Sequence, residues 1–243
     1  MTGKPQHIGI VACSAEGAAL CYRTICTEGP ELLGPHAHPE VSMHTPSLAD
    51  YTPYLDREYW PGVGRLMLES AKKLAAIGAD FLICPDNTIH QALPHVSPAS
   101  PLPWLHIAEV VAEQAATRGF KRLGLTGTRW LVESDVYPDA LAAQGLSYVR
   151  PAADEREELN RIVMAELVCG RFTPEAVAYF QRVVEKMKRE GCEAVILGCT
   201  EFPFLMNDGN SPLPTLDSTR LLARAALRRA VEAQHSGTDG NGK

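Results

Sequence analysis

Short apolar segments alternate along this chain with longer amphipathic stretches of helical length. The apolar segments are HIGIVA (7–12), DFLICP (80–85), RLGLTG (122–127) and AVILGC (194–199). The amphipathic stretches are 61–77, 107–118 and 155–190. Several apolar segments contain almost no polar residue, which is typical of parallel strands covered by helices on both faces. The alternation therefore predicts an α/β protein with parallel sheets.

An internal repeat organises this pattern. The segments KKLAAIGADFLICPDNT (72–88) and EKMKREGCEAVILGCTE (185–201) align without a gap. The alignment pairs Gly78 with Gly191, Asp80 with Glu193, and Asp86 with Cys199. In each copy a helix ends at the glycine, one buried strand follows, and a polar residue comes where that strand stops. The repeat predicts two duplicated α/β units, each with a second matching strand upstream.

The expected architecture is two similar α/β domains. The first domain covers 1–106 and is completed by a C-terminal helix at 216–234, and the second covers 107–215. The polar, Gly-rich tail 235–243 is expected to be flexible. Open α/β sheets bind ligands outside the carboxyl ends of their strands. We therefore expect Asp86 and Cys199 to face each other across one cleft.

Composition and charge exclude several classes of partner. The 243 residues carry a net charge of -6 with scattered Lys and Arg, so the chain lacks the basic surface that nucleic acid requires. No apolar run approaches the roughly 20 residues of a membrane span, and no signal-peptide pattern is present, so we expect no membrane partner and a cytoplasmic location. Seven cysteines without CxxC or Cys/His spacing fit a reducing compartment and predict no metal site.

The paired strand ends carry the candidate chemistry. Two polar groups at equivalent positions of repeated units suit proton transfer to opposite faces of one carbon. The structural alternatives are core packing for Cys199 and helix capping for Asp86. A thiolate is better matched than a carboxylate to an α-proton, so Cys199, at a partly exposed strand end, is the favoured base. Close together, the two groups would share one proton, as neutral Asp86 with the Cys199 thiolate or as the tautomer of that state.

Several strings resemble the aspartate/glutamate racemase superfamily, in particular its cofactor-independent amino-acid racemases. They include GIVACSAEGAALCYR (9–23), PDNTIH (85–90), LGLTGTRWLVESDVY (123–137) and LGCTEFPFL (197–205). Together they cover most of the chain in the order that the family shows. The resemblance implies two pseudo-symmetric Rossmann-like α/β domains with one active site between them. In that site two cysteines exchange a proton with the α-carbon, without a metal or pyridoxal phosphate. We accordingly expect no cofactor.

The chain departs from the family pattern at the first cysteine, because PDNTIH has Asp86 where the family usually reads PCNTAH. Cys84 lies two residues earlier, about 6.6 Å deeper along the strand at ~3.3 Å per residue, and cannot simply substitute. The expected catalytic residues are therefore Asp86 and Cys199. The expected substrate-binding residues lie in the first loop, in the turns after the strands and on the family's long helix. They are Ser14, Asn87, Thr88, Thr128, Thr200, Glu201, Glu166 and His44.

These observations predict an isomerase. The first hypothesis is a racemase or epimerase of a small carboxylate substrate, with acidic amino acids favoured, that works by proton transfer between Asp86 and Cys199. One alternative is a decarboxylase, lyase or cis-trans isomerase that acts on a dicarboxylic acid through Cys199. The other is a ligand-binding relative without catalysis. The sequence leaves the side chain of the substrate open, and a homodimer is an open option for the assembly.

Overall fold

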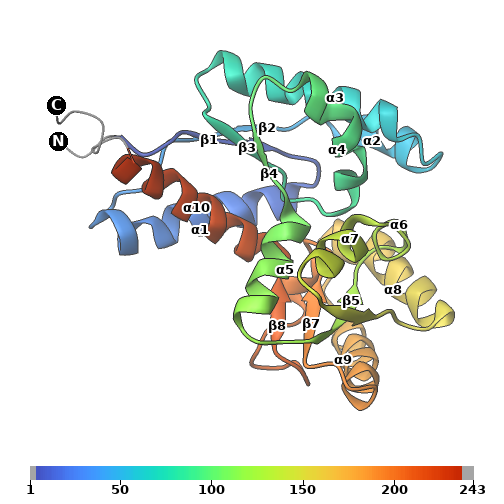
Figure 1. Cartoon of the computed structure of the whole chain (residues 1–243). Helices are drawn as coiled ribbons and strands as arrows, with labels where there is room; N and C mark the ends of the chain where they lie inside the picture. Colours follow the sequence, from blue (N-terminus) through green and yellow to red (C-terminus); the bar gives the residue numbers. More distant parts are fainter. Residues whose placement is uncertain (1–3, 237–243) are drawn as a thin grey trace. The chain divides into compact units, whose positions relative to one another are not determined.

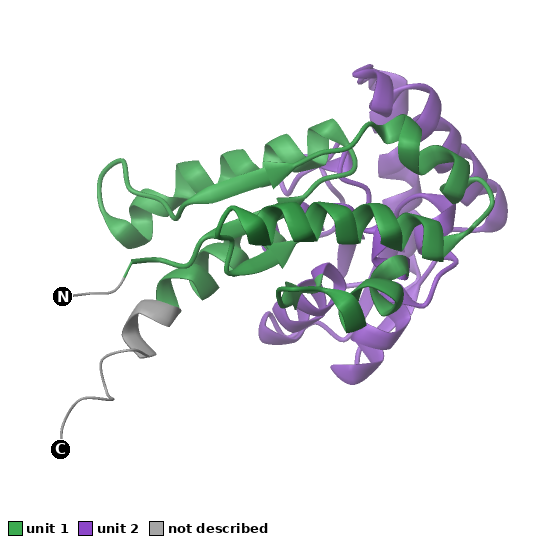
Figure 2. Cartoon of the chain, turned by 90° about the horizontal axis from the view of Figure 1, so that it is seen from above, with its two compact units in different colours: residues 1–85, 92–106, 222–243 green, residues 86–91, 107–221 purple. Residues whose placement is uncertain are grey.

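A computed structural model describes residues 4–236 of the chain, which form two compact units (Figure 2). Unit 1 contains the described residues up to 85, residues 92–106 and those from 222 onward. Unit 2 contains residues 86–91 and 107–221. Each unit is built around one four-stranded sheet in which every pair of neighbouring strands is parallel. The predicted α/β fold with parallel sheets is confirmed.

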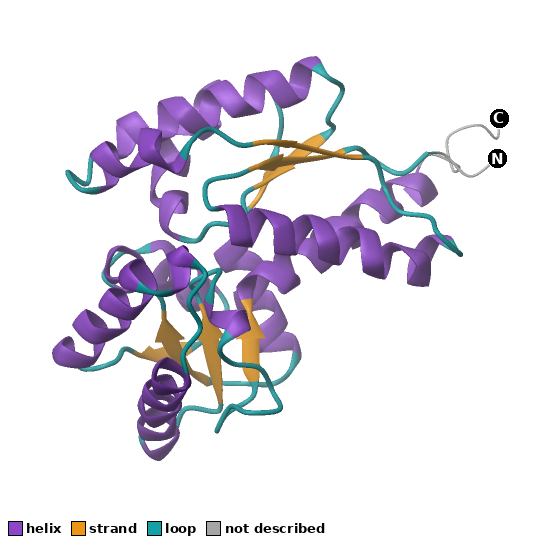
Figure 3. Cartoon of the chain, turned by 180° about the vertical axis from the view of Figure 1, so that it is seen from behind, coloured by secondary structure: helices purple, strands orange, loops and turns teal. Residues whose placement is uncertain are grey.

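The sheet of unit 1 has the strand order β2-β1-β3-β4. These strands are β2 (Val41–His44), β1 (Ile8–Val11), β3 (Phe81–Ile83) and β4 (Trp104–Leu105). Its helices are α1 (Ala15–Leu33), α2 (Leu48–Leu55), α3 (Trp60–Ala76) and α4 (Leu93–Val96). α3 covers one face of this sheet, and α1 and α10 lie on the other (Figures 1 and 3). Every residue of β1 and β3 is buried, which explains why these segments are almost wholly apolar.

The sheet of unit 2 has the order β6-β5-β7-β8. Its strands are β6 (Ser147–Val149), β5 (Arg122–Thr126), β7 (Ala194–Leu197) and β8 (Thr215–Asp217). Its helices are α5 (Ile107–Thr117), α6 (Arg129–Val132), α7 (Val136–Ala143), α8 (Ala153–Ala165), α9 (Pro174–Arg189) and the first turn of α10 (Ser218–Ser236). Val195 and Leu197 pack with residues of α8 and α9, whereas Ala194 and Ile196 pack with residues of α5 and α7. Alternate residues of β7 thus serve two hydrophobic layers.

The two units repeat one design in detail. The strand orders are equivalent once β1 to β4 are matched with β5 to β8. Gly78 and Gly191 both have positive φ, at 91° and 86°, which explains why glycine occupies this position in both copies. The carboxylate of Asp80 accepts a hydrogen bond from the backbone N–H of His7 at 2.6 Å. Its counterpart Glu193 accepts one from the N–H of Arg122 at 3.2 Å, so each acid ties its strand to the start of the neighbouring one.

Three features differ from the sequence-based boundaries. The stretch 155–190 forms two helices, because the chain turns at Gly170 with a φ of 70° and α9 begins at Pro174. α10 starts at Ser218 and reaches Ser236, so it includes the first two residues of the expected tail, while 237–243 lie outside the described residues. Residues 86–91, which the sequence placed in the first domain, lie with unit 2 because their side chains bond to that unit.

Candidate active site

The carboxyl edge of the unit 2 sheet collects the polar residues that follow β5, β7 and β8. Segment 86–91 is bonded to this edge. The hydroxyls of Thr88 and Thr128 lie 3.0 Å apart, and Gln91 Nε2 donates to the carbonyl of Trp130 at 3.0 Å. Cys199 lies two residues after the end of β7, and Asp86 and Cys199 belong to one compact unit. Open α/β sheets bind ligands at such an edge.

Asp86 is half-buried at the start of this segment. Its Oδ1 accepts a hydrogen bond from the backbone N–H of Ile89 at 3.2 Å, which is the capping arrangement that the sequence predicted as one alternative. Its carbonyl oxygen lies 2.7 Å from Nδ1 of His90, whose Nε2 lies 3.3 Å from the backbone N of Ile107. The imidazole therefore donates through Nδ1 and accepts through Nε2, and the local backbone around Asp86 is fixed on both sides.

Cys199 is buried, with only 5% of its surface exposed, rather than partly exposed as the sequence suggested. Its Sγ donates a hydrogen bond to Oε2 of Glu201 at 3.0 Å. Burial raises the pKa of the Cys199 thiol well above its ordinary value, and the charges of Glu201 and Asp86 act in the same direction. The resting group is therefore a thiol. Of the two states that the sequence left open for the shared proton, burial favours the one with the proton on Cys199.

Thr200 and Glu201 were expected to bind the substrate, but in this structure their side chains bond to each other. The hydroxyl of Thr200 donates to Oε2 of Glu201 at 3.0 Å, the same oxygen that accepts from Cys199. Glu201 is itself buried, at 4% exposure. In this structure Oε2 of Glu201 is therefore the hydrogen-bond acceptor for both Cys199 and Thr200.

Gly198, immediately before Cys199, explains how β5 and β7 approach closely at this edge. Its N–H donates to the carbonyl of Thr126 at 3.0 Å. A Cβ at this position would run into that carbonyl oxygen and would lie 2.7 Å from Cδ2 of Leu131. The backbone carbonyl cannot move without breaking the sheet, so no other residue fits without strain.

Gly198→Ala should therefore destabilise the protein by about 1–3 kcal/mol, the range for overpacking a tight site. The measurement is urea or thermal unfolding followed by circular dichroism. Gly209→Ala in the same unit is the matched control, because its Cβ would meet only the end of the Asn207 side chain at 3.0 Å. Equal stability of the two variants would show that the carboxyl edge has more room than the structure indicates.

The side chain of Asn87 is fully engaged within unit 2. Its Oδ1 accepts from the hydroxyl of Tyr137 at 2.7 Å, and its Nδ2 donates to Oγ of Ser218 at 3.0 Å. Thr128 Oγ1 also accepts from the backbone N–H of Leu131 at 3.3 Å and so caps α6. The sequence did not single out Tyr137 or Ser218. Ser218 carried a usable signal, because it is a polar residue at a strand end, as Cys199 is.

The expected binding residues Ser14 and His44 lie in unit 1. Ser14 has extended backbone at the N-cap of α1. His44 ends β2, where Lys73 Nζ donates to its Nε2 at 3.0 Å, so its Nδ1 carries the hydrogen that points at Ser70 Oγ, 2.9 Å away. Burial, and next the charge of Lys73, lower the pKa of His44, which keeps the imidazole neutral.

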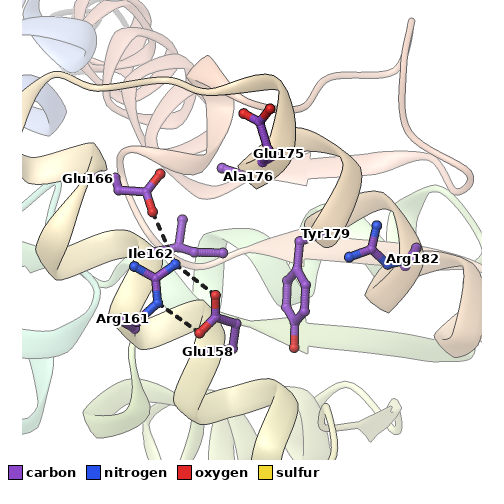
Figure 4. A pocket seen from close by; sticks show the side chains of 8 residues that line it. All are labelled: Glu158, Arg161, Ile162, Glu166, Glu175, Ala176, Tyr179 and Arg182. Atoms are coloured by element: carbon purple, nitrogen blue, oxygen red, sulfur yellow. Dashed lines mark hydrogen bonds and ion pairs between the residues drawn. The ribbon is translucent and has the colours of Figure 1, made fainter.

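Glu166, expected near the substrate, lines a pocket of about 240 Å³ between α8 and α9 (Figure 4). Its carboxylate accepts from Arg161 at 3.1 Å and from the hydroxyl of Thr173 at 3.1 Å. Arg161 also makes a two-point bond with Glu158 in the same pocket. Neither Asp86 nor Cys199 is among the residues that line this pocket.

Two other classes of site have no counterpart in residues 4–236. These residues contain no group of three or more His, Cys, Asp or Glu side chains placed to hold a metal ion. None of their helices is both long and apolar enough to cross a membrane.

The model of the Asp/Glu/Hydantoin racemase family matches residues 9–226, which is most of the chain. The chain belongs to this family. The resemblance that the sequence motifs suggested is confirmed, and so is the predicted enzyme class, because the relatives are racemases and racemases are isomerases.

Individual members of the racemase family show how far the similarity extends. The broad specificity amino-acid racemase RacX of Bacillus subtilis is 23% identical over 67% of this chain and 70% of its own length. A glutamate racemase of Thermus thermophilus is 32% identical over 71% of this chain but only 63% of its own length. A crystal structure from Yersinia pestis, described provisionally as an Asp/Glu racemase, superposes with a TM-score of 0.85 at 28% identity, over 93% of this chain and 99% of that one.

Proposed function

We propose that this chain racemises an amino acid by proton transfer between Asp86 and Cys199. The observation that carries the proposal is the placement of both groups in unit 2, with Asp86 close enough for its charge to raise the pKa of the Cys199 thiol. Membership of the racemase family supports the reaction class. The burial of Cys199 supports a role for its thiol as an acid.

The resting state supplies one base and one acid. The Asp86 carboxylate removes the α-proton from one enantiomer and becomes neutral, and the electron pair is left on the α-carbon and the substrate carboxylate. The Sγ–H of Cys199 then delivers its proton to the opposite face and becomes a thiolate. The product is the other enantiomer, and no net proton is gained or lost.

The reverse direction starts from the state that the first turnover leaves behind. The thiolate of Cys199 removes the α-proton of the second enantiomer, and neutral Asp86 returns a proton to the first face. Glu201 keeps this state short-lived, because its carboxylate and the thiolate repel each other across a 3.0 Å contact. We therefore expect unequal rate constants in the two directions, within the limit that the equilibrium constant sets.

We also propose acidic amino acids as the substrate class. The glutamate racemase of Thermus thermophilus and the structure from Yersinia pestis point to glutamate and aspartate by their descriptions. RacX is described as having broad specificity, so a neutral amino acid belongs in the same test. Among the expected binding residues, Thr88 and Thr128 are proposed to contact the substrate, because their hydroxyls are only part-buried at the sheet edge.

The experiment is incubation of the purified protein with each enantiomer of glutamate, aspartate and alanine in deuterated water. We expect deuterium at the α-carbon by NMR together with loss of optical purity on a chiral column, fastest for an acidic amino acid. Both signals are needed, since exchange with retained configuration would mean that only one of the two groups acts.

Two other outcomes would contradict the proposal. A new product such as carbon dioxide or an unsaturated acid would identify a decarboxylase or lyase that uses Cys199 as the proton donor. Tight binding by calorimetry without exchange or product would identify a ligand-binding relative. Exchange that is fastest for alanine would retain the racemase and reject the acidic substrate class.

A further inference from the structure

A continuous chain of buried hydrogen bonds joins the segment that carries Asp86 to the strand end that leads to Cys199. Tyr137 Oη donates to Asn87 Oδ1 at 2.7 Å, Asn87 Nδ2 donates to Ser218 Oγ at 3.0 Å, and Ser218 Oγ donates to the carbonyl of Leu197 at 2.7 Å. Asn87 directly follows Asp86, and Leu197 lies two residues before Cys199. All four residues of this chain lie within unit 2.

The direction of every bond in this chain is fixed. The Leu197 carbonyl can only accept a hydrogen bond, so the Ser218 hydroxyl donates its hydrogen to that carbonyl. The Ser218 oxygen must then accept from Asn87. The amide of Asn87 therefore presents its Nδ2 to Ser218 and its Oδ1 to Tyr137. Tyr137 and Ser218 are wholly buried and Asn87 is 2% exposed, so water cannot replace a lost partner easily.

The residue directly after Asp86 is tied by this chain to the end of β7 and the start of α10. The bonds of Thr88 and Gln91 to the α6 region lie further along the segment. The capping bond from Ile89 acts within the segment, whereas His90 links the carbonyl of Asp86 to the backbone N–H of Ile107 at the start of α5. Asn87 supplies the link to the strand that leads to Cys199.

We propose that Tyr137, Asn87 and Ser218 are positioning residues that hold Asp86 at the sheet edge next to Cys199. The inference rests on the proposed function of that pair. The three side chains do not touch the reacting atoms, and they act by fixing the backbone at residue 86. Displacements of about 1 Å from the reacting geometry can lower a rate by about 10²-fold.

The test uses Tyr137→Phe, which removes only the hydroxyl at the start of the chain. We expect kcat for racemisation to fall by about 10- to 100-fold with a smaller change in KM, because the hydroxyl that is removed does not itself contact the substrate. The second readout is the rate at which iodoacetamide modifies Cys199, followed by peptide mass spectrometry from about pH 7 to pH 10. Since the charge of Asp86 opposes ionisation of this thiol, release of Asp86 should move the profile to lower pH, and Asp86→Asn should move it in the same direction.

Two further variants separate positioning from simple stability. Ser218→Ala breaks the chain at its other end and should reproduce both effects, which keeps the test open if Tyr137→Phe folds poorly. Thr126→Val is the matched control, because Thr126 is a wholly buried residue whose hydroxyl donates at 2.6 Å to the carbonyl of Ile196, the residue next to Leu197. It should lower thermal stability without moving the Cys199 profile.

The two proposals fail in different ways. If the protein without substitutions racemises no amino acid, the proposed function is wrong. The pH profile of Cys199 alkylation still reports where Asp86 lies. If Tyr137→Phe and Ser218→Ala keep the unmodified profile and kcat, or resemble Thr126→Val in both readouts, the hydrogen-bond chain is structural only and the inference is overturned.

Discussion

Replacement of Cys199 by serine should lower the rate of racemisation by at least about 10²-fold and leave the fold nearly intact. A serine hydroxyl is a far weaker acid than a thiol, and this factor is the usual scale for loss of a positioned acid-base group. Ser can still donate a hydrogen bond toward Glu201, the partner of Sγ at 3.0 Å, so we expect the loss of stability to stay near 1 kcal/mol. Chiral chromatography for the rate and thermal unfolding for stability measure the two quantities.

Cys192→Ser provides the matched control for this variant. Cys192 is also 5% exposed and belongs to the same hydrophobic cluster as Cys199, but it lies at the other end of β7. It should show a similar loss of stability with unchanged racemisation. Equal activity of both variants would exclude the thiol of Cys199 from the chemistry, and equal loss in both would mean that the effect comes from packing.

Asp86→Asn and Asp86→Cys together should separate catalysis from capping. Asn keeps a side-chain oxygen for the N–H of Ile89, so stability should change by well under about 1 kcal/mol, whereas racemisation should fall by about 10²-fold because an amide cannot take up the proton. Cys restores the two-thiol arrangement that the family resemblance implies. That variant should retain or gain racemisation of an acidic amino acid.

The racemisation activities of the two variants together decide whether residue 86 acts in catalysis or only as a helix cap. Full activity of Asp86→Asn would make Asp86 a cap and nothing more. An inactive Asp86→Asn with an equally inactive Asp86→Cys would favour a lyase or decarboxylase that requires a carboxylate here. Asp86→Ala, which removes both the cap and the carboxylate, calibrates stability, with an expected loss of about 0.5–2 kcal/mol.

The state of the candidate pair shows how tertiary structure changes a chemical argument. From the sequence, Cys199 was the favoured base, because a thiolate is better matched than a carboxylate to an α-proton, and the shared proton could lie on either group. In the structure, burial and the neighbouring Glu201 favour the thiol, and the proposed function accordingly takes Asp86 as the resting base. The prediction used correct reference values, but desolvation is decided by which residues cover the sulfur, and no local pattern specifies that.

The expected binding set illustrates the same limit. Glu201, two residues from Cys199, was expected to hold an anion, yet its carboxylate accepts the thiol hydrogen. Glu166 was expected near the substrate, yet its partners are Arg161 and Thr173 in the pocket between α8 and α9. Residue type and position on an element were correct in both cases. The direction of each side chain depends on partners from neighbouring turns and helices.

The repeated α/β architecture can be predicted from the amino-acid sequence alone, because its signals are local. Apolar runs mark buried strands, and the positive φ of Gly78 and Gly191 requires the residue that the alignment pairs. The family followed from motifs that span most of the chain. Only the tertiary structure decided that Asn87 joins Tyr137 and Ser218, which lie 50 and 131 residues away along the chain. Such contacts depend on packing between distant elements. The type of a polar side chain, such as a hydroxyl or an amide, does not specify which partner it will bond to in the folded protein.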